Sequence, residues 1–324
     1  MKITKTKDGR ANLYISRQGE GYFRQKGKVL LEGWTNLMFS VLPQPVNGNM
    51  YYVDISKQPL DFPDNSFDAI YAYHVFEHLT PGEGQQFALE IMRVLKPGGI
   101  FRISVPDLEE ICRDYLHYLE KSIEEPTDEN IRRYKWYVME IFEEMVRDKT
   151  GGLMLEALRR GEYDEEYANE WISDAFKSFF KVDKDENPTS TKQQIDKTLV
   201  QHNSKLKKGP KKLYLDFMRR IRDLMIKSFF NNDKILPRSH PLITKEAERW
   251  MYDRLSLKLL VENAGFVEFT QKTFKDSDIP NWEKYDLDRS NHADRAIDPS
   301  LYVECLKTGI QPTQGTGKCR PKDI

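Results

Sequence analysis

The chain has 324 residues, of which 39% are apolar and 31% charged, and its formal net charge is −1. A chain of this length can bury a substantial core in one large or two smaller domains. Its near-neutral charge gives no general electrostatic attraction to nucleic acid or to an anionic membrane, and no apolar run approaches the roughly 20 residues that span a bilayer.

The first third of the chain predicts a sheet of short strands. From about Ala11 to Val105, apolar runs alternate with loops, and the fifth run is Ile100 to Val105. The segment PGEGQQFALEIMRVLKPGG before it predicts a helix that begins near Pro81, presents one apolar face and ends at Pro97-Gly98-Gly99. Because ligands bind outside the carboxyl ends of strands in an open α/β sheet, the polar residues that follow these runs are candidates for a site.

The middle of the chain predicts helices, and the sheet pattern then resumes. EEICRDYLHYLEKSI, IRRYKWYVMEIFEEMVRD and LYLDFMRRIRDLMIKSFF show helical spacing of apolar and aromatic residues. A helix from Thr244 to Ala264 and strands in FVEFTQKTF and SLYVECLKT follow. We therefore expect a sheet opened by a long helical insertion, with a first part of the sheet (1–107), the insertion (108–235), the second part of the sheet (236–310) and a flexible tail (311–324).

Four phrases carry a resemblance to a known family. They are VDISKQPLDFPDNSFDAIYAYHVFEHL, EIMRVLKPGGIFRISVPD, RWMYDRLSLKLLVENAGF and SLYVECLK. They resemble class I S-adenosylmethionine-dependent methyltransferases of the type 11 kind, in a bacterial subgroup often found near surface-polysaccharide genes. The resemblance implies an α/β fold with a Rossmann-like, mostly parallel sheet, S-adenosyl-L-methionine as the cofactor, and methyl transfer as the activity.

The resemblance assigns Asp54 and Ile55 to the adenine of the cofactor. Asp54 matches the acidic residue after the third strand, which accepts a hydrogen bond from the adenine amino group, and Ile55 packs on the ring. A carboxylate is a suitable acceptor for an exocyclic amine. The alternative for Asp54 is an aspartate that caps a turn or a helix.

His74 is the first candidate for a catalytic base. It matches the residue just past the fourth strand, so that Tyr73 and His74 lie beside the methionine end of the cofactor. An imidazole there can accept a proton from a hydroxyl nucleophile; alternatively, His74 only contacts or orients the cofactor. His74 and His78 have a spacing that can bind a metal, but no glutamate placed as in the HExxH pattern accompanies them, and no metal site is predicted.

Asp107 is the second candidate for the base, because it follows the fifth strand and Pro106. The alternative is that Asp107 caps the helix LEEICRDYL.

The N-terminal part departs from the family pattern. Gly19 and Gly21 remain where a glycine-rich turn approaches the cofactor, but Ser16 and Arg17 stand where small residues are expected. Arg17 could neutralise the cofactor's carboxylate. Met38 lies where the second strand normally leads into an acid that binds the ribose hydroxyls, a role for which Glu20 or Glu32 could substitute.

We therefore predict a methyltransferase that acts on an oxygen of a small-molecule or saccharide acceptor. The rival hypothesis is a methyltransferase-like protein with a degenerate cofactor site, which acts as a non-catalytic partner or uses the pocket for another ligand or reaction. We expect no nucleic-acid partner and no membrane span, and a homodimer is left open. The three cysteines fit no zinc or disulfide spacing, and the N-terminus lacks a secretory signal, so a cytoplasmic protein is expected.

Overall fold

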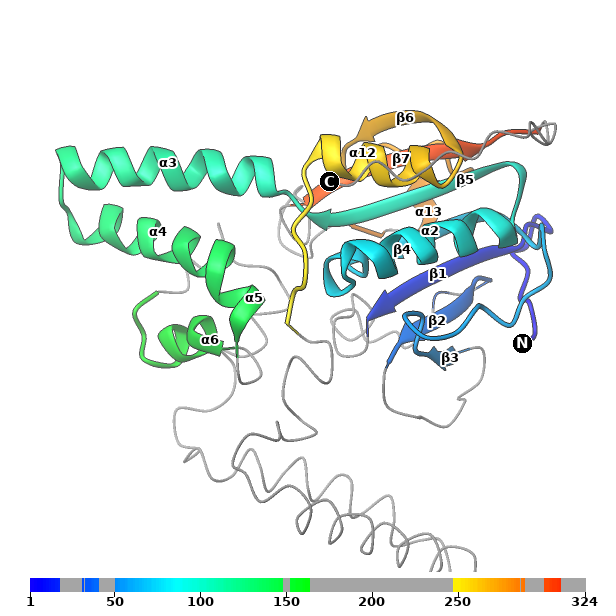
Figure 1. Ribbon diagram of the computed structural model, residues 1–324, viewed down its shortest axis with the longest axis horizontal. Coiled ribbons are helices and arrows are strands. Elements are labelled where there is room, and N and C mark those ends of the chain that lie inside the picture. Colours follow the sequence, from blue (N-terminus) through cyan, green and yellow to red (C-terminus); the bar gives the residue numbers. More distant parts are fainter. Residues whose placement is uncertain are drawn as a thin grey trace, which may run out of the picture.

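The computed structural model describes residues 1–17, 31, 33–40, 50–147, 152–163, 247–285, 287–288 and 300–309. Within them lies one seven-stranded sheet with the strand order β3-β2-β1-β4-β5-β7-β6 (Figure 1). The strands are β1 (Asn12–Arg17), β2 (Thr35–Phe39), β3 (Met50–Val53), β4 (Phe67–Tyr73), β5 (Leu95–Pro106), β6 (Phe266–Lys272) and β7 (Ser300–Lys307). Neighbours among β1 to β5 are parallel, whereas β7 is antiparallel to β5 and to β6. The mostly parallel α/β sheet predicted from the sequence is confirmed.

The order of the strands reverses between β1 and β4. The chain passes outward from β1 to β2 and β3 and then returns to β4 on the other side of β1. Ser16 of β1 is paired with Tyr73 of β4, so these two strands end together. The carboxyl ends of β1 and β4 therefore form the topological switch point, where open α/β sheets bind their ligands.

One face of the sheet is covered by α2 (Pro81–Val94) and α12 (Arg254–Asn263), which lie side by side (Figure 1). Thr80 begins α2 with a capping box that it forms with Glu83. The apolar stripes of both helices are buried against the sheet; their buried members are Phe87, Ala88, Ile91, Val94, Leu257, Leu260 and Val261.

Two helix boundaries differ from the prediction. α2 ends at Val94 rather than at Pro97-Gly98-Gly99, because Leu95 has extended backbone angles and pairs with Phe67 in the sheet. Of the helix expected from Thr244, the described residues 247–253 are not helical and α12 begins at Arg254, because Asp253 caps it by accepting from the backbone N–H groups of Leu255 and Ser256.

The helical insertion begins directly after β5, as predicted. Figure 1 shows its helices beside the sheet, beyond the carboxyl end of β5. They are α3 (Leu108–Glu124), α4 (Asp128–Val138), the π-helix η2 (Met139–Glu143), α5 (Glu144–Val146) and α6 (Gly152–Arg159). The rings of Tyr118 and Tyr137 stack with centroids 5.7 Å apart and join α3 to α4. The third helix that we predicted, LYLDFMRRIRDLMIKSFF, lies outside the described residues.

Candidate functional site

The candidate site lies at the carboxyl ends of the parallel strands. Ser16 and Arg17 end β1, and both are buried. Ser16 is paired with Met38 of β2, and its hydroxyl lies 3.3 Å from the Met38 sulfur. A thioether sulfur is a weak hydrogen-bond acceptor. Thr35 to Ser40 contains no acidic residue. Gly19 and Gly21, together with Glu20 and Glu32, lie outside the described residues, so the prediction for the glycine turn stays a prediction.

Asp54 directly follows β3 and closes a turn. Its Oδ1 accepts from the backbone N–H of Ser56 at 3.2 Å and from the Ser56 hydroxyl at 2.5 Å. Its Oδ2 lies 3.1 Å from the ammonium of Lys57, whose side chain is 73% exposed. Ile55 beside it is buried in the main apolar core. The alternative that we gave for Asp54, a turn aspartate, therefore describes its local geometry, while its role toward a cofactor remains a proposal.

His74 follows β4 in a left-handed backbone conformation, with φ at 47°. This conformation costs a residue other than glycine about 1–2 kcal/mol, and surrounding contacts must hold it. The backbone N–H of His74 donates to the carbonyl of Ser104 in β5 at 3.1 Å. The ring then lies with its centroid 4.7 Å from that of Tyr73, which is itself buried.

Both ring nitrogens of His74 have polar neighbours. Nδ1 lies 3.0 Å from Oε1 of Glu77, in the short 3₁₀ helix η1 (Phe76–His78). Nε2 lies 2.9 Å from the hydroxyl of Ser300, the first residue of β7. The His74 side chain is 12% exposed and that of Glu77 only 2%, so the histidine spans from the interior toward the surface.

His74 and His78 do not share one helix face, because His74 precedes the 3₁₀ helix in which His78 lies. They approach the same atom instead, since Nε2 of His78 is 3.9 Å from Oε1 of Glu77. Among the described residues, no group of three His, Cys, Asp or Glu side chains is arranged to hold a metal ion.

Asp107 caps helix α3. Its Oδ1 accepts from the backbone N–H groups of Glu109 and Glu110 at 3.0 and 3.2 Å. Asp107 also forms an isolated parallel bridge with Tyr252, on the segment that returns from the insertion. Asp107 is therefore a helix cap, the alternative that the sequence offered, and its role as a proton acceptor stays a prediction.

The returning segment is attached to the same residue that orients His74. The backbone carbonyl of Glu77 accepts from the N–H groups of Arg249 and Trp250 at 2.6 and 3.1 Å. Burial raises the pKa of Glu248 well above its usual range, and the nearby carboxyl of Glu144 in α5 raises it further. The site and the insertion therefore meet at a buried acidic cluster.

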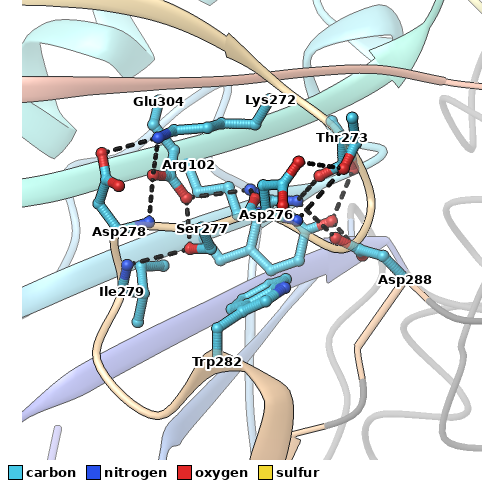
Figure 2. Close-up of polar contacts among 12 residues, drawn as sticks. Arg102, Lys272, Thr273, Asp276, Ser277, Asp278, Ile279, Trp282, Asp288 and Glu304 are labelled. Carbon is cyan, nitrogen blue, oxygen red and sulfur yellow. Dashed lines mark hydrogen bonds and ion pairs between the residues drawn. The ribbon is translucent and has the colours of Figure 1, made fainter.

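On the other face of the sheet, a buried polar network lies behind the site (Figure 2). The guanidinium of Arg102 in β5 lies 3.0 Å from Asp288 and 3.0 Å from Glu304 of β7, and it is 4.3 Å from the ring centre of Trp282 in α13 (Trp282–Tyr285). Tyr71 Oη lies 2.5 Å from Asp288 Oδ1. Burial raises the pKa of Asp288, with Arg102 and Tyr71 acting against it. A charge on His74 also lowers the pKa of Asp288, so this network is electrostatically coupled to the site.

Sequence reasoning missed three contributors to the site. Glu77 was visible three residues after His74, but its role depends on the left-handed turn at His74. Ser300 is 226 residues from His74 in the chain, and Asp288 contributes only through the folded network. No local pattern marks the last two.

Chemically, the arrangement combines a switch point, an imidazole held by a carboxylate, and a hydroxyl. It can bind a ligand over the strand ends and accept a proton from it. Within the described residues, no helix is long and apolar enough to cross a bilayer.

Comparison with known proteins points to one family. Residues 40–103 match the family described as "Methyltransferase domain". The match begins after β1 and β2 and includes Asp54, Ile55, Tyr73 and His74.

Individual relatives match over short stretches. The sterol 24-C-methyltransferase of Yarrowia lipolytica is 50% identical over 72 residues, which cover 19% of this chain and 18% of that protein. The ubiquinone/menaquinone biosynthesis C-methyltransferase of Vibrio cholerae is 33% identical over 102 residues, which cover 29% of this chain and 38% of that protein. This chain thus spans well under half the length of these curated relatives.

Among solved structures, the 1,6-didemethyltoxoflavin-N1-methyltransferase of Burkholderia thailandensis, with bound S-adenosylhomocysteine, is 21% identical. It aligns over 30% of this chain and 46% of its own, with a TM-score of 0.23.

Proposed function

We propose that this chain is a class I S-adenosylmethionine-dependent methyltransferase that methylates an oxygen of a small-molecule or saccharide acceptor; the match of residues 40–103 to a methyltransferase domain and the mostly parallel sheet support this. His74 accepts the proton of the acceptor hydroxyl. The observation that carries the proposal is the position of His74 at the carboxyl end of β4, with its ring held from both sides beside the switch point.

The residues at the strand ends fit the cofactor. The surface pair between Asp54 and the exposed Lys57 contributes little stability, so Asp54 Oδ2 is available to accept from the adenine amino group instead. Tyr73 ends β4 and His74 follows it, on the other side of β2 and β1 from Asp54, where the methionine part would lie. When bound, the cofactor supplies an electrophilic methyl group on a sulfonium sulfur; the protein supplies positioning, exclusion of water and an acceptor for the proton.

The structure favours His74 over Asp107 as the base. Asp107 Oδ1 already accepts from two backbone N–H groups at the start of α3, so this oxygen is engaged in capping the helix. The imidazole of His74 lies instead between Glu77 Oε1 and the Ser300 hydroxyl, beside the carboxyl end of β4.

A second candidate function has its own support. Asp54 is engaged in a turn, and β2 ends without an acid. A protein with this fold that no longer binds the cofactor would have the same features. It would act as a non-catalytic partner or use the pocket for another ligand.

The experiment is methyl transfer from tritium-labelled S-adenosylmethionine to an acceptor panel. The panel contains a catechol, a phenol and a pyranoside as oxygen acceptors, and a sterol and a demethylated quinol as carbon acceptors, since the relatives named above are C-methyltransferases. We expect label on oxygen, lost in His74→Asn, because asparagine tolerates the left-handed backbone but cannot take up the proton. Label on carbon would overturn the oxygen assignment, and transfer that is unchanged in His74→Asn would overturn the role of His74.

A further inference from the structure

We propose that Glu77, His74 and Ser300 form a proton relay in which Glu77 positions the imidazole and Ser300 passes the acceptor's proton to it. The inference rests on the proposed function and deepens it: it names two further residues of the same site and explains how a hydroxyl acceptor reaches the base.

The tautomer of His74 follows from its partners. A carboxylate has no proton to donate, so the contact between Glu77 Oε1 and Nδ1 at 3.0 Å requires the proton to be on Nδ1. In the neutral ring, Nε2 then carries the lone pair and accepts from the Ser300 hydroxyl at 2.9 Å. Glu77 thereby aims the basic nitrogen at Ser300.

Glu77 is built to hold this orientation. Its side chain is only 2% exposed, and its backbone carbonyl is fixed by Arg249 and Trp250. A buried carboxylate beside Nδ1 also stabilises the imidazolium that forms when Nε2 takes up a proton, as the acidic member of a catalytic triad does. Glu77 touches neither acceptor nor cofactor in this account, and it is a positioning residue.

Ser300 lies beside the base because of its place in the sheet, and the relay puts the acceptor next to its hydroxyl. It pairs with Pro106 in the antiparallel β5–β7 ladder, which puts it at the same sheet edge as His74. A hydroxyl can donate one hydrogen bond while it accepts another, so Ser300 can receive from the acceptor as it donates to His74. Because the Ser300 hydroxyl lies 2.9 Å from Nε2, the proton passes through this hydroxyl rather than displacing it.

The step balances in atoms and charge. The acceptor oxygen bonds to the methyl carbon, the carbon–sulfur bond breaks with its electron pair going to sulfur, and the sulfonium becomes a neutral thioether. The acceptor's proton goes to Ser300 Oγ while the Ser300 proton goes to His74 Nε2. The imidazolium then releases its proton to solvent.

The experiment compares the full-length wild type with Glu77→Gln, Ser300→Ala and Ser300→Thr. Nitrogen-15 NMR of histidine-labelled protein reads the tautomer of His74 without any acceptor or cofactor, and His74→Asn assigns its signals. We expect a protonated Nδ1 and a bare Nε2 in the wild type, and a shift toward protonated Nε2 in Glu77→Gln. A wild-type ring protonated on Nε2 in its neutral form would overturn the proposal.

Turnover on the best oxygen acceptor of the panel supplies the second readout. We expect kcat to fall about tenfold or more in Ser300→Ala and to stay within about threefold in Ser300→Thr, which keeps the hydroxyl. A kcat in Ser300→Ala at or above the wild-type value would mean that Ser300 only occupies the acceptor's place, and the relay would be wrong. Urea unfolding of both Ser300 variants controls for stability.

The two proposals fail separately. If the wild type methylates but Ser300→Ala matches it, only the relay fails. If the wild type does not methylate, the proposed function fails, and the tautomer of His74 still decides whether Glu77 positions the ring.

Discussion

Asp288 and Arg102 form an ion pair at 3.0 Å in which neither side chain is exposed to solvent. Arg102 also contacts Glu304 at 3.0 Å and lies over the ring of Trp282. Two carboxylates therefore share one buried cation, and this network fastens the segment after β6 to the face of the sheet behind the site.

The first prediction concerns this network. Arg102→Met leaves Asp288 buried without its cation, whereas Glu304 keeps Lys272 at 4.0 Å. Breaking a buried pair in this way costs about 3–5 kcal/mol of unfolding free energy. Arg113→Met is the matched control, since Arg113 is 71% exposed in its pair with Glu109 and should contribute about 0.5 kcal/mol or less. Urea unfolding measures both. Equal effects of the two substitutions would contradict the structural role of Arg102.

The second prediction compares two glycines of α2. A Cβ on Gly84 would lie 3.0 Å from the Tyr252 hydroxyl and 3.3 Å from Leu260 Cδ1, whereas a Cβ on Gly82 meets nothing within 4 Å. Gly84→Ala should destabilise by about 1–3 kcal/mol through overpacking. Gly82→Ala should be neutral or stabilise by up to about 1 kcal/mol. If thermal unfolding shows the reverse order, α2 and α12 do not pack as described.

The third prediction concerns pH. Burial raises the pKa of Glu140 to about 8, although a hydrogen bond from Trp136 Nε1 at 2.7 Å favours the carboxylate. Because the folded protein holds this proton more tightly than the unfolded chain does, Glu140 contributes stability that is fully present below the unfolded pKa of about 4.5 and is lost as the pH rises to about 8. Glu140→Gln keeps an acceptor for Trp136 and cannot ionise.

Urea unfolding between pH 5 and pH 8 tests this linkage. The wild type should lose stability relative to Glu140→Gln as the pH rises over this range. Parallel pH profiles of the two proteins would show that Glu140 does not titrate abnormally.

The fourth prediction separates a helix cap from a base at Asp107. Asparagine caps helices about as well as aspartate but cannot accept a proton, so Asp107→Asn should keep both stability and methyl transfer. Asp107→Ala should lose about 1 kcal/mol of unfolding free energy. A large loss of turnover in Asp107→Asn, with unchanged unfolding, would instead make Asp107 the base.

The central strands could be predicted from the sequence because their apolar runs are buried in the sheet. The runs that end at Val53, Tyr73 and Val105 are strands, and the insertion follows the last of them. Helix ends were less predictable where tertiary contacts decide them. Helix α2 ends before Leu95 because the backbone of Leu95 pairs with that of Phe67. No local sequence pattern predicts this pairing.

Only the site residues at the ends of strands could be predicted from the sequence. Asp54, Tyr73, His74 and Asp107 were visible because they directly follow or end strands, and the end of a strand is a local feature. The partners of His74 were not, since Ser300 comes from the far end of the chain and Glu77 becomes a partner only through the turn at His74.

The most direct test of the account is isothermal titration of the full-length chain with S-adenosylmethionine. We predict saturable binding that Asp54→Ala weakens by about one to two decades, the effect of removing a charged acceptor. Asp64→Ala should bind like the wild type, because Asp64 is 68% exposed and pairs with Arg93 away from the strand ends. No binding by the folded wild type at millimolar S-adenosylmethionine would contradict the account.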